Sequence, residues 1–178
     1  METTSTKPAI IVVASLAIKM TKPLITVLLP TRKRTAMVKK SISTILELAT
    51  DPSRIHIAVA YDSDDAESET YFTSNEWKSL VENTSATQEV HEINRLGWTA
   101  LHEYYNFLAT NIDSEWYFIW NDDAFMQTQG WDQEIWENKN YNSLISMESN
   151  GKLPDSTLFP CVPKLWVDTF GMIGMNPV

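Results

Sequence analysis

Short apolar stretches along the chain are typical of buried β-strands. Three of them are continuous runs of large or β-branched residues bounded by polar residues or proline, and a fourth is more polar. We predict strands at these four places, with ends that depend on the flanking turn residues. They lie at residues 24–29, 55–61, 116–120 and 88–93.

Patterns of helical period separate these strands. Between residues 38 and 49 the apolar side chains recur at spacings of three and four, with charged residues on the opposite face. Residues 73–76 resemble a capping box, which predicts a short helix behind them. The predicted helices are 38–49, a short one through Val81, 97–110 and 132–138, and a last strand is predicted at 143–147.

The order of these elements predicts the fold class. Strands and helices that alternate in this way favour an α/β fold, with a mostly parallel sheet and helices on both faces. A less regular tail follows the fourth strand and its helix. The 178 residues suffice for one domain with its own core, which we place at residues 23–178.

Residues 1–22 are interpreted as an extension ahead of this domain. Within it, residues 9–18 form an apolar run as long as the core of a signal peptide. Only Lys7 is basic before this run and a good cleavage site is missing, which argues against that alternative. The run is also too short to span a bilayer, which takes about 20 residues. We expect a cytoplasmic protein without a stable membrane span.

Composition excludes several classes of function. The chain carries 23 acidic and 14 basic side chains, a formal net charge of −9, which argues against a surface that binds nucleic acid or anionic membranes. The one cysteine, Cys161, can form no disulfide within the chain and no cysteine-based zinc site, and we expect a small buried side chain there. A local basic cluster at residues 32–34 suggests a pocket for an anion.

Two acid clusters each follow an apolar run that is predicted to be a strand. Residues 62–65 (DSDD) follow the second strand, and residues 121–123 (NDD) follow the fourth. Ligands of open α/β sheets bind at the carboxyl ends of the strands, and carboxylates suit Mg²⁺ and Mn²⁺. We therefore predict a metal-assisted site for a phosphate-bearing ligand, with solvated acidic turns as the alternative. An EF-hand is excluded, because its sixth and twelfth positions are Glu67 and Thr73.

The first predicted strand is also followed by residues that could bind a ligand. Arg32 and Arg34 follow Pro30 and Thr31, where a guanidinium group could clamp a phosphate or carboxylate. Glycine-rich phosphate loops of the familiar kinds are missing from the sequence. Aromatic rings near the predicted site edge could pack on a sugar, although core packing is the alternative for each, and Tyr104 and Tyr105 are assigned to the core. These rings are Trp98, Trp131 and Trp136.

The segments that carry this chemistry resemble family 2 glycosyltransferases with the GT-A (Rossmann-like) fold. The similarity covers about residues 24–174. Residues 119–123 resemble the DxD motif of that family with Asn121 in place of the first Asp, and Asn106 stands where the family often has an asparagine. The chain ends at Val178, which is early for the family. The other matching segments are 25–34, 40–46, 61–62, 130–132 and 159–171.

The resemblance implies binding of a nucleotide-diphosphate sugar of the UDP or GDP type. Pro30, Thr31 and Asp62 would hold the nucleoside, and Asp122 would touch the ribose or the donor sugar. Arginines would lie near the nucleoside or the phosphates. The implied donor-binding residues are Pro30, Thr31, Arg32, Arg34, Asp62, Asp64, Arg95 and Asp122.

The resemblance also implies the chemistry of transfer. Asp123, together with Asp122, would coordinate Mn²⁺ or Mg²⁺ bridging the diphosphate. The sugar would pass to a carbohydrate or other hydroxyl acceptor, with inversion at the anomeric carbon. Inverting members use a later acid as general base, and the candidates here are Asp168 and Asp155.

Three alternatives remain open at this point. A nucleotidyltransferase would share the sheet, but that class opens with a glycine-rich basic loop, which residues 30–34 are not. A nucleotide-sugar or carbohydrate binding domain that has lost catalysis would suit Asn121 and the early end. A purely structural domain would leave the two acid clusters unexplained. The many tryptophans would also suit an interface in a homo-oligomer.

Overall fold

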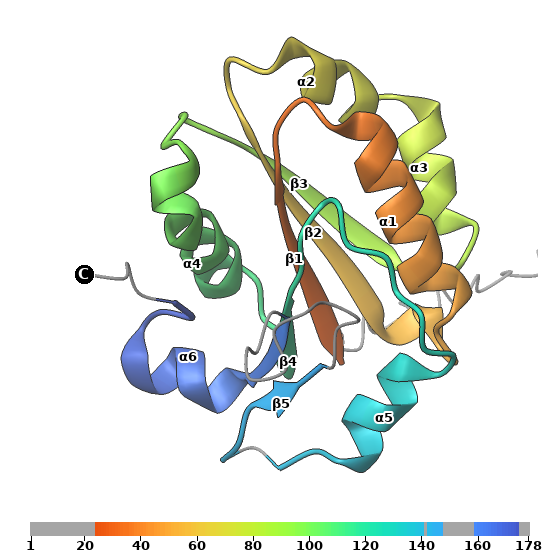
Figure 1. Ribbon diagram of the computed structural model, residues 1–178, viewed down its shortest axis with the longest axis vertical. Helices are drawn as coiled ribbons and strands as arrows, with labels where there is room; N and C mark the ends of the chain where they lie inside the picture. The colour runs from red at the N-terminus through yellow and green to blue at the C-terminus, as the bar shows by residue number, and fades with distance from the viewer. Residues whose placement is uncertain (1–23, 141, 148–158, 175–178) are drawn as a thin grey trace, which may run out of the picture.

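A β-sheet with helices against both faces forms the part of the chain that the structure describes, residues 24–140, 142–147 and 159–174, in a computed structural model (Figure 1). The six strands of this part lie in the order β3-β2-β1-β4-β6-β5. They are β1 (Ile25–Thr31), β2 (Ile55–Asp62), β3 (Thr87–Ile93), β4 (Trp116–Ile119), β5 (Ile145–Ser146) and β6 (Pro160–Pro163). The helices are α1 (Thr35–Glu47), α2 (Ala66–Phe72), α3 (Asn75–Glu82), α4 (Leu101–Asn111), α5 (Trp131–Glu137) and α6 (Lys164–Phe170), with short 3₁₀ turns η1 (Pro52–Arg54) and η2 (Trp98–Ala100).

Strand β1 lies at the centre of the sheet. It pairs in parallel with β2 on one side and with β4 on the other, and β2 pairs in parallel with β3. All seven residues of β1 are buried, because both of its faces are covered, and this explains its continuous apolar run. The expected parallel sheet is confirmed for these four strands, whereas β6 runs antiparallel to β4 and β5 antiparallel to β6.

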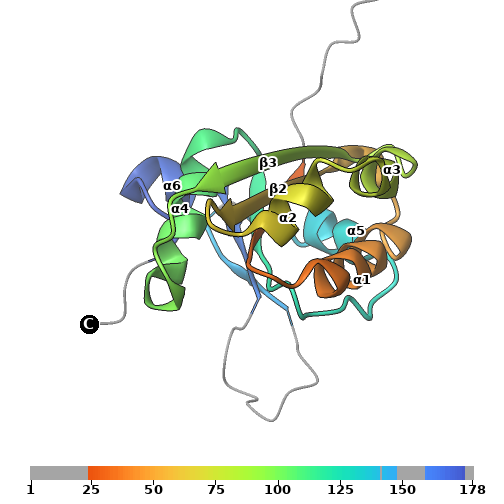
Figure 2. The same cartoon turned by 90° about the horizontal axis from the view of Figure 1, so that it is seen from above.

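Two layers of helices cover the sheet. Leu29 of β1 packs in the core with Trp77 of α3 and Trp131 of α5, which are both fully buried. Its neighbour Leu28 points to the opposite face and packs with Leu108 of α4, because successive strand residues alternate between faces. Helices α4 and α6 lie on one side of the strands and α1, α3 and α5 on the other (Figure 1, Figure 2). The expectation of helices on both faces is therefore confirmed.

The structure adds three elements that the patterns do not predict, α2, β6 and α6. The buried residues of α2 are Ser68 and Phe72 alone, so this helix has no apolar repeat to detect. In α6 only Val167 is buried, so its apolar residues do not form a stripe toward the core. Cys161 is buried in β6, as expected, and burial raises the pKa of its thiol. The expected extension at residues 1–22 lies outside the described residues.

The turn into α5 ties that helix to the end of α1. Gly130 adopts a left-handed conformation with φ of 72° and donates its N–H to the carbonyl of Leu48 (2.7 Å). The buried carboxylate of Asp132 accepts the backbone N–H groups of Thr50 (2.7 Å) and Asp51 (2.9 Å). These charge-assisted bonds hold the α1–β2 connection against the start of α5.

Replacement of Asp132 by Ala should lower the free energy of unfolding by about 2 kcal/mol, because two backbone N–H groups lose a charged acceptor. Urea denaturation followed by tryptophan fluorescence measures the change. Asp168→Ala is the control, because it removes an exposed acid that pairs with Lys164 one turn away, and it should cost about 0.5 kcal/mol or less. Equal losses in the two variants would contradict this assignment.

Candidate functional site

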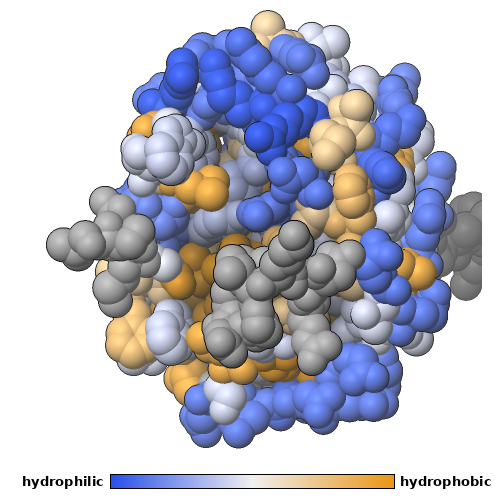
Figure 3. All heavy atoms as spheres, in the orientation of Figure 1, coloured by the Kyte–Doolittle hydropathy of each residue, from blue (hydrophilic) through white to orange (hydrophobic). Residues whose placement is uncertain are grey.

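A cleft of about 470 Å³ opens at the carboxyl ends of the parallel strands. Its walls come from the loop after β1, the end of β2, the segment before α4 and the loop after β4. The chain leaves β1 for β2 on one side and returns to β4 on the other, so the cleft lies where the strand order reverses. Hydrophilic residues gather along the upper rim of this face, over α2 and the loops beside it, and the face is hollowed below them (Figure 3).

Most of the residues singled out in the sequence come together at this cleft. Both acid clusters reach it, although they are about sixty residues apart in the chain. Asp64 is not part of the wall but bonds to two arginines that are. The predicted residues that line the cleft are Pro30, Thr31, Arg32, Arg34, Asp62, Arg95, Asp122 and Asp123.

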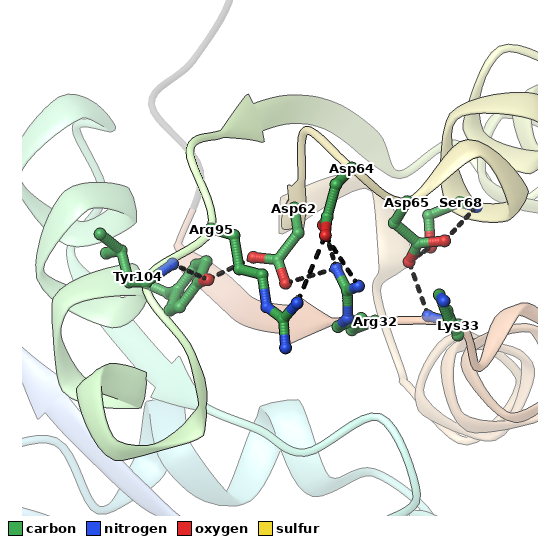
Figure 4. Close-up of polar contacts among 9 residues, drawn as sticks. Arg32, Lys33, Asp62, Asp64, Asp65, Ser68, Arg95 and Tyr104 are labelled. Carbon is green, nitrogen blue, oxygen red and sulfur yellow. Dashed lines mark hydrogen bonds and ion pairs between the residues drawn. The ribbon is translucent and has the colours of Figure 1, made fainter.

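In the first acid cluster, Arg32 lies between two carboxylates (Figure 4). Its Nη1 donates to Asp62 Oδ2 (2.8 Å) and also to Asp64 Oδ1, and its Nη2 donates to Asp64 Oδ2 (3.0 Å). Arg95 approaches the same Asp64 from the other side, with its Nη1 3.4 Å from Oδ2. The Asp64 carboxylate raises the pKa of Arg32, and the Arg32 guanidinium lowers the pKa of Asp64. This cluster is therefore a network of charges that are already paired.

Tyr104 connects this cluster to α4. Its hydroxyl donates to Asp62 Oδ1 and accepts the backbone N–H of Leu96 (2.9 Å). Burial raises the pKa of Tyr104, and the neighbouring Asp62 raises it further. The assignment of Tyr104 to the core was therefore incomplete, because its ring is buried but its hydroxyl orients a carboxylate that lines the cleft.

The third acid of this cluster has a structural role. Asp65 is buried and accepts the N–H (3.2 Å) and the hydroxyl (2.6 Å) of Ser68, which makes it the N-cap of α2. It also accepts the N–H of Lys33 (2.6 Å), a residue held in the left-handed region with φ of 51°. Burial acts to raise the pKa of Asp65, but these hydrogen bonds outweigh it and the pKa is lowered. Asp65 thus joins the loops after β1 and β2.

In the second acid cluster, Asp122 is held from two sides. The hydroxyl of Thr31 donates to its Oδ2 (2.7 Å), and Arg34 Nη1 donates to its Oδ1 (2.9 Å). The same Arg34 nitrogen reaches Asp123 Oδ2 (3.2 Å). The pKa of Arg34 is raised, mainly by Asp122. The Asp122 side chain is 10% exposed and that of Asp123 is 52% exposed, so Asp123 is the more accessible of the pair.

Tyr105 packs beneath this second cluster. Its hydroxyl lies 2.9 Å from the carbonyl oxygen of Trp120 and 3.0 Å from Asn121 Oδ1. Burial raises the pKa of Tyr105, and the carboxylates of Asp122 and Asp123 add to that effect. Tyr105, like Tyr104, therefore has a core ring and a hydroxyl at the cleft. The helical pattern alone could not show this, because it places only the ring.

The acid pair Asp122 and Asp123 has the chemistry of a divalent cation site. The described residues contain no group of three or more His, Cys, Asp or Glu side chains that could hold a metal. Two carboxylates nevertheless fit Mg²⁺, which is usually held by one or two carboxylates together with substrate phosphates and water. The pair already binds a cationic group here, the guanidinium of Arg34. The residues present therefore fit such a cation.

The structure does not bring Asp168, one of the two candidates for the general base, to the cleft. Strand β6 runs antiparallel to β4, so α6 begins at the opposite edge of the sheet, where the N–H of Lys164 donates to the carbonyl of Glu115 (2.9 Å). The carboxylate of Asp168 pairs with the Lys164 side chain (2.9 Å) and is exposed. Asp155 lies outside the described residues.

The tryptophans also separate. Trp98 lines the cleft and is 88% exposed. Trp131 is buried in the core, where its indole N–H donates to the carbonyl of Ile45 (2.9 Å). Trp136 lies against Arg54, with the guanidinium carbon 4.6 Å from its ring centre, and away from the cleft. Only Trp98 of the three is thus placed at the site edge.

Asn106 faces the end of the described chain rather than the cleft. Its Oδ1 accepts the N–H groups of Ile173 (2.8 Å) and Gly174 (3.1 Å), and its Nδ2 donates to the carbonyl of Gly174 (3.0 Å). The asparagine that contributes to the family resemblance thus fastens the segment after α6 to α4.

Solved structures place this architecture in a known fold. A mannosyltransferase from Pyrobaculum calidifontis, solved with GDP-Man and Mn²⁺, superimposes with a TM-score of 0.66 at 12% identity, over 86% of this chain and 48% of that one. TarS of S. aureus, residues 1–349 with UDP, superimposes with a TM-score of 0.59 at 12% identity, over 82% and 48%. This chain has the GT-A fold. It spans about half the length of these GT-A proteins.

The comparisons by sequence found no match, and a further solved structure agrees with the fold. No protein-family model matches the sequence, and no curated protein matches it. A second TarS structure, solved with UDP-GlcNAc, gives a TM-score of 0.56 at 13% identity, over 82% of this chain and 47% of that one. Among the described residues, the helices of this GT-A domain are all too short or too polar to cross a membrane.

Asp65→Asn should reduce stability at neutral pH by about 1 kcal/mol, because an N-cap and a charge-assisted bond are weakened. The lowered pKa means that the contribution is fully present above the ordinary value of 3.8 and is lost as pH falls through the folded value. The difference in free energy of unfolding between wild type and variant should therefore become smaller below about pH 4. Urea denaturation at several pH values measures it. If the difference in free energy of unfolding were the same at every pH, the charge of Asp65 would not be the cause of its contribution.

Proposed function

We propose that this chain binds a nucleotide-diphosphate sugar in the cleft and transfers the sugar to an acceptor hydroxyl with the help of a divalent cation. The observation that carries the proposal is the convergence of three arginines and both acid clusters on one cleft at the carboxyl edge of a GT-A sheet. The neighbours support it, because the mannosyltransferase was solved with GDP-Man and Mn²⁺ and TarS with UDP and UDP-GlcNAc.

The first cluster would bind the nucleoside end of the donor. Asp62 is oriented by Tyr104 and Arg32, so its carboxylate is fixed for hydrogen bonds to a base or ribose, with Pro30 and Thr31 beside it. Arg32 and Arg95 would face the phosphates, which offer them an anion in place of Asp64. Trp98 exposes a ring on which a sugar or base could pack.

The second cluster would act at the diphosphate. Asp122 and Asp123 would hold Mn²⁺ or Mg²⁺, with Asp122 also near the ribose or the donor sugar. A bound cation would neutralise the charge that develops on the leaving diphosphate. Asp122 is kept in place by the hydroxyl of Thr31, so it would be positioned before the ligand arrives.

Transfer requires a group that takes the proton from the acceptor. The acceptor oxygen forms a bond to the anomeric carbon, the bond from that carbon to the phosphate oxygen breaks, and the hydroxyl proton passes to a general base. Attack opposite the leaving group inverts the anomeric carbon. With Asp168 on the opposite edge of the sheet, Asp155 is the acid from the sequence that we propose for this step. The strands that flank it in the chain, β5 and β6, pair with each other, and β6 pairs with β4.

Thermal-shift screening against UDP-, GDP-, TDP- and CDP-sugars, with Mn²⁺ and with EDTA, tests donor binding. A ligand at roughly 100 times its dissociation constant should add about 2.7 kcal/mol of stability, which a shift in melting temperature detects. We expect a shift with one nucleotide class that is larger with Mn²⁺. If none of the nucleotide sugars shifted the melting temperature, the proposal would be contradicted.

Asp123→Ala should abolish the metal-dependent part of donor binding, because it removes the more accessible carboxylate of the pair. Isothermal titration of the nucleotide found in the screen, with Mn²⁺ and with EDTA, measures the loss. Asp168→Ala is the matched control, since it removes an exposed acid far from the cleft and should bind as wild type. Unchanged affinity of the Asp123 variant would rule out this residue as a ligand of the metal.

A second candidate is a domain that binds the donor without transferring it. The observation that favours it is Asn121, which replaces the first acid of the DxD-like segment and lies 3.0 Å from the hydroxyl of Tyr105. Donor binding without hydrolysis or transfer to any acceptor in a library would support this candidate. Release of pyrophosphate from a nucleoside triphosphate would instead support a nucleotidyltransferase.

A further inference from the structure

We propose that the guanidinium group of Arg34 competes with the divalent cation for the acid pair, so that the cation and the diphosphate bind cooperatively. Arg34 would leave Asp122 and Asp123 when the cation arrives and would take a phosphate oxygen as its new partner. This inference rests on the proposed function, because it assigns a role to Arg34 within the same site.

The competition follows from which oxygens are free. Thr31 donates to Asp122 Oδ2 at 2.7 Å, so this oxygen already has a buried partner. The other oxygen, Oδ1, is the one that Arg34 holds at 2.9 Å, and Arg34 also holds Asp123 Oδ2 at 3.2 Å. A cation that binds both carboxylates therefore competes with the guanidinium for Asp122 Oδ1, and it would take its second oxygen from Asp123 beside the same guanidinium. Two positive groups at one position would also repel each other.

The side chain of Arg34 is less firmly held than that of Arg32. The Arg34 side chain is 54% exposed and uses one nitrogen for both carboxylates. Its backbone stays engaged without the side chain, because its carbonyl accepts the N–H groups of Met37 and Val38 (both 2.9 Å) at the start of α1. Arg32 is 28% exposed and uses two nitrogens. The pair of Arg34 with Asp123 is exposed on both sides, and exposed ion pairs are weak, so the guanidinium can exchange this partner at low cost.

Cooperativity follows from the two exchanges taken together. A cation alone displaces Arg34, whose charge then has only water for a partner. A diphosphate alone meets Asp122 and Asp123, which repel it, and an arginine that is already paired. When both bind, the carboxylates hold the cation and Arg34 holds a phosphate. The phosphate then gives Arg34 a new partner, and the cation removes the repulsion between the carboxylates and the phosphate. By linkage, each must raise the affinity of the other by the same factor.

Titration with Mn²⁺ alone tests the competition directly. Free Mn²⁺ is measured by electron paramagnetic resonance for wild type, Arg34→Gln and Arg54→Gln, with melting temperatures to check folding. We expect Arg34→Gln to bind Mn²⁺ about fivefold more tightly than wild type, the effect of removing one exposed ion-pair partner. Arg54→Gln is the matched control, because it removes the same charge from a guanidinium that lies on the ring of Trp136, outside the cleft lining, and it should change the Mn²⁺ affinity by less than about twofold.

The same titrations with UDP or GDP present test the cooperativity. The nucleotide should raise the Mn²⁺ affinity of wild type by a larger factor than that of Arg34→Gln. The inference is overturned if Arg34→Gln binds Mn²⁺ no more tightly than wild type, or if Arg54→Gln gains as much Mn²⁺ affinity as Arg34→Gln. Failure of the proposed function looks different, because then no nucleotide binds to wild type, whereas the comparison with Mn²⁺ alone still decides the role of Arg34.

Discussion

The pairing of arginines with aspartates at the carboxyl edge of the sheet is the interaction on which the cleft depends. Asp62 and Asp64 come from one strand end and Asp122 and Asp123 from another, and these like charges would repel each other. The loop after β1 inserts cationic groups between them, because β1 lies between β2 and β4 and all three strands run the same way. A parallel sheet with β1 at its centre thus brings the aspartates together and also places the arginines that neutralise them.

Each acid pair combines a buried member with an exposed one. Asp62 is buried and held by Tyr104, while Asp64 is exposed beside two arginines. Asp122 is likewise buried and held by Thr31, while Asp123 is exposed. The buried member fixes the geometry, since its hydrogen bonds to neutral hydroxyls do not depend on a ligand. The exposed member can exchange its arginine for a new partner at low cost, because exposed ion pairs are weak.

The sequence predicted the parts of this arrangement that depend on burial on both faces or on charge next to a strand. Strands β1, β2 and β4 are mostly apolar because helices cover both sides, and the acids at the ends of β2 and β4 then had to lie at the same end of the sheet. The sequence could not show what depends on packing or direction. The hydroxyl of Tyr104 reaches Asp62 only because α4 lies against β1 and β2, and Asp168 is remote only because β6 runs antiparallel. Helix α2 was missed because a polar helix has no period to detect.

Asn121 is consistent with this balance of charge. Its Oδ1 lies 3.0 Å from the hydroxyl of Tyr105, in a place that is already next to two carboxylates and is served by a single arginine, Arg34. An aspartate there would add a third negative charge beside a buried hydroxyl without adding a cation. An amide keeps the hydrogen bond to Tyr105 and leaves the charge unchanged. Under the proposed exchange of a guanidinium for a divalent cation, two carboxylates would supply enough negative charge, because the phosphates of the donor would complete the coordination of the cation.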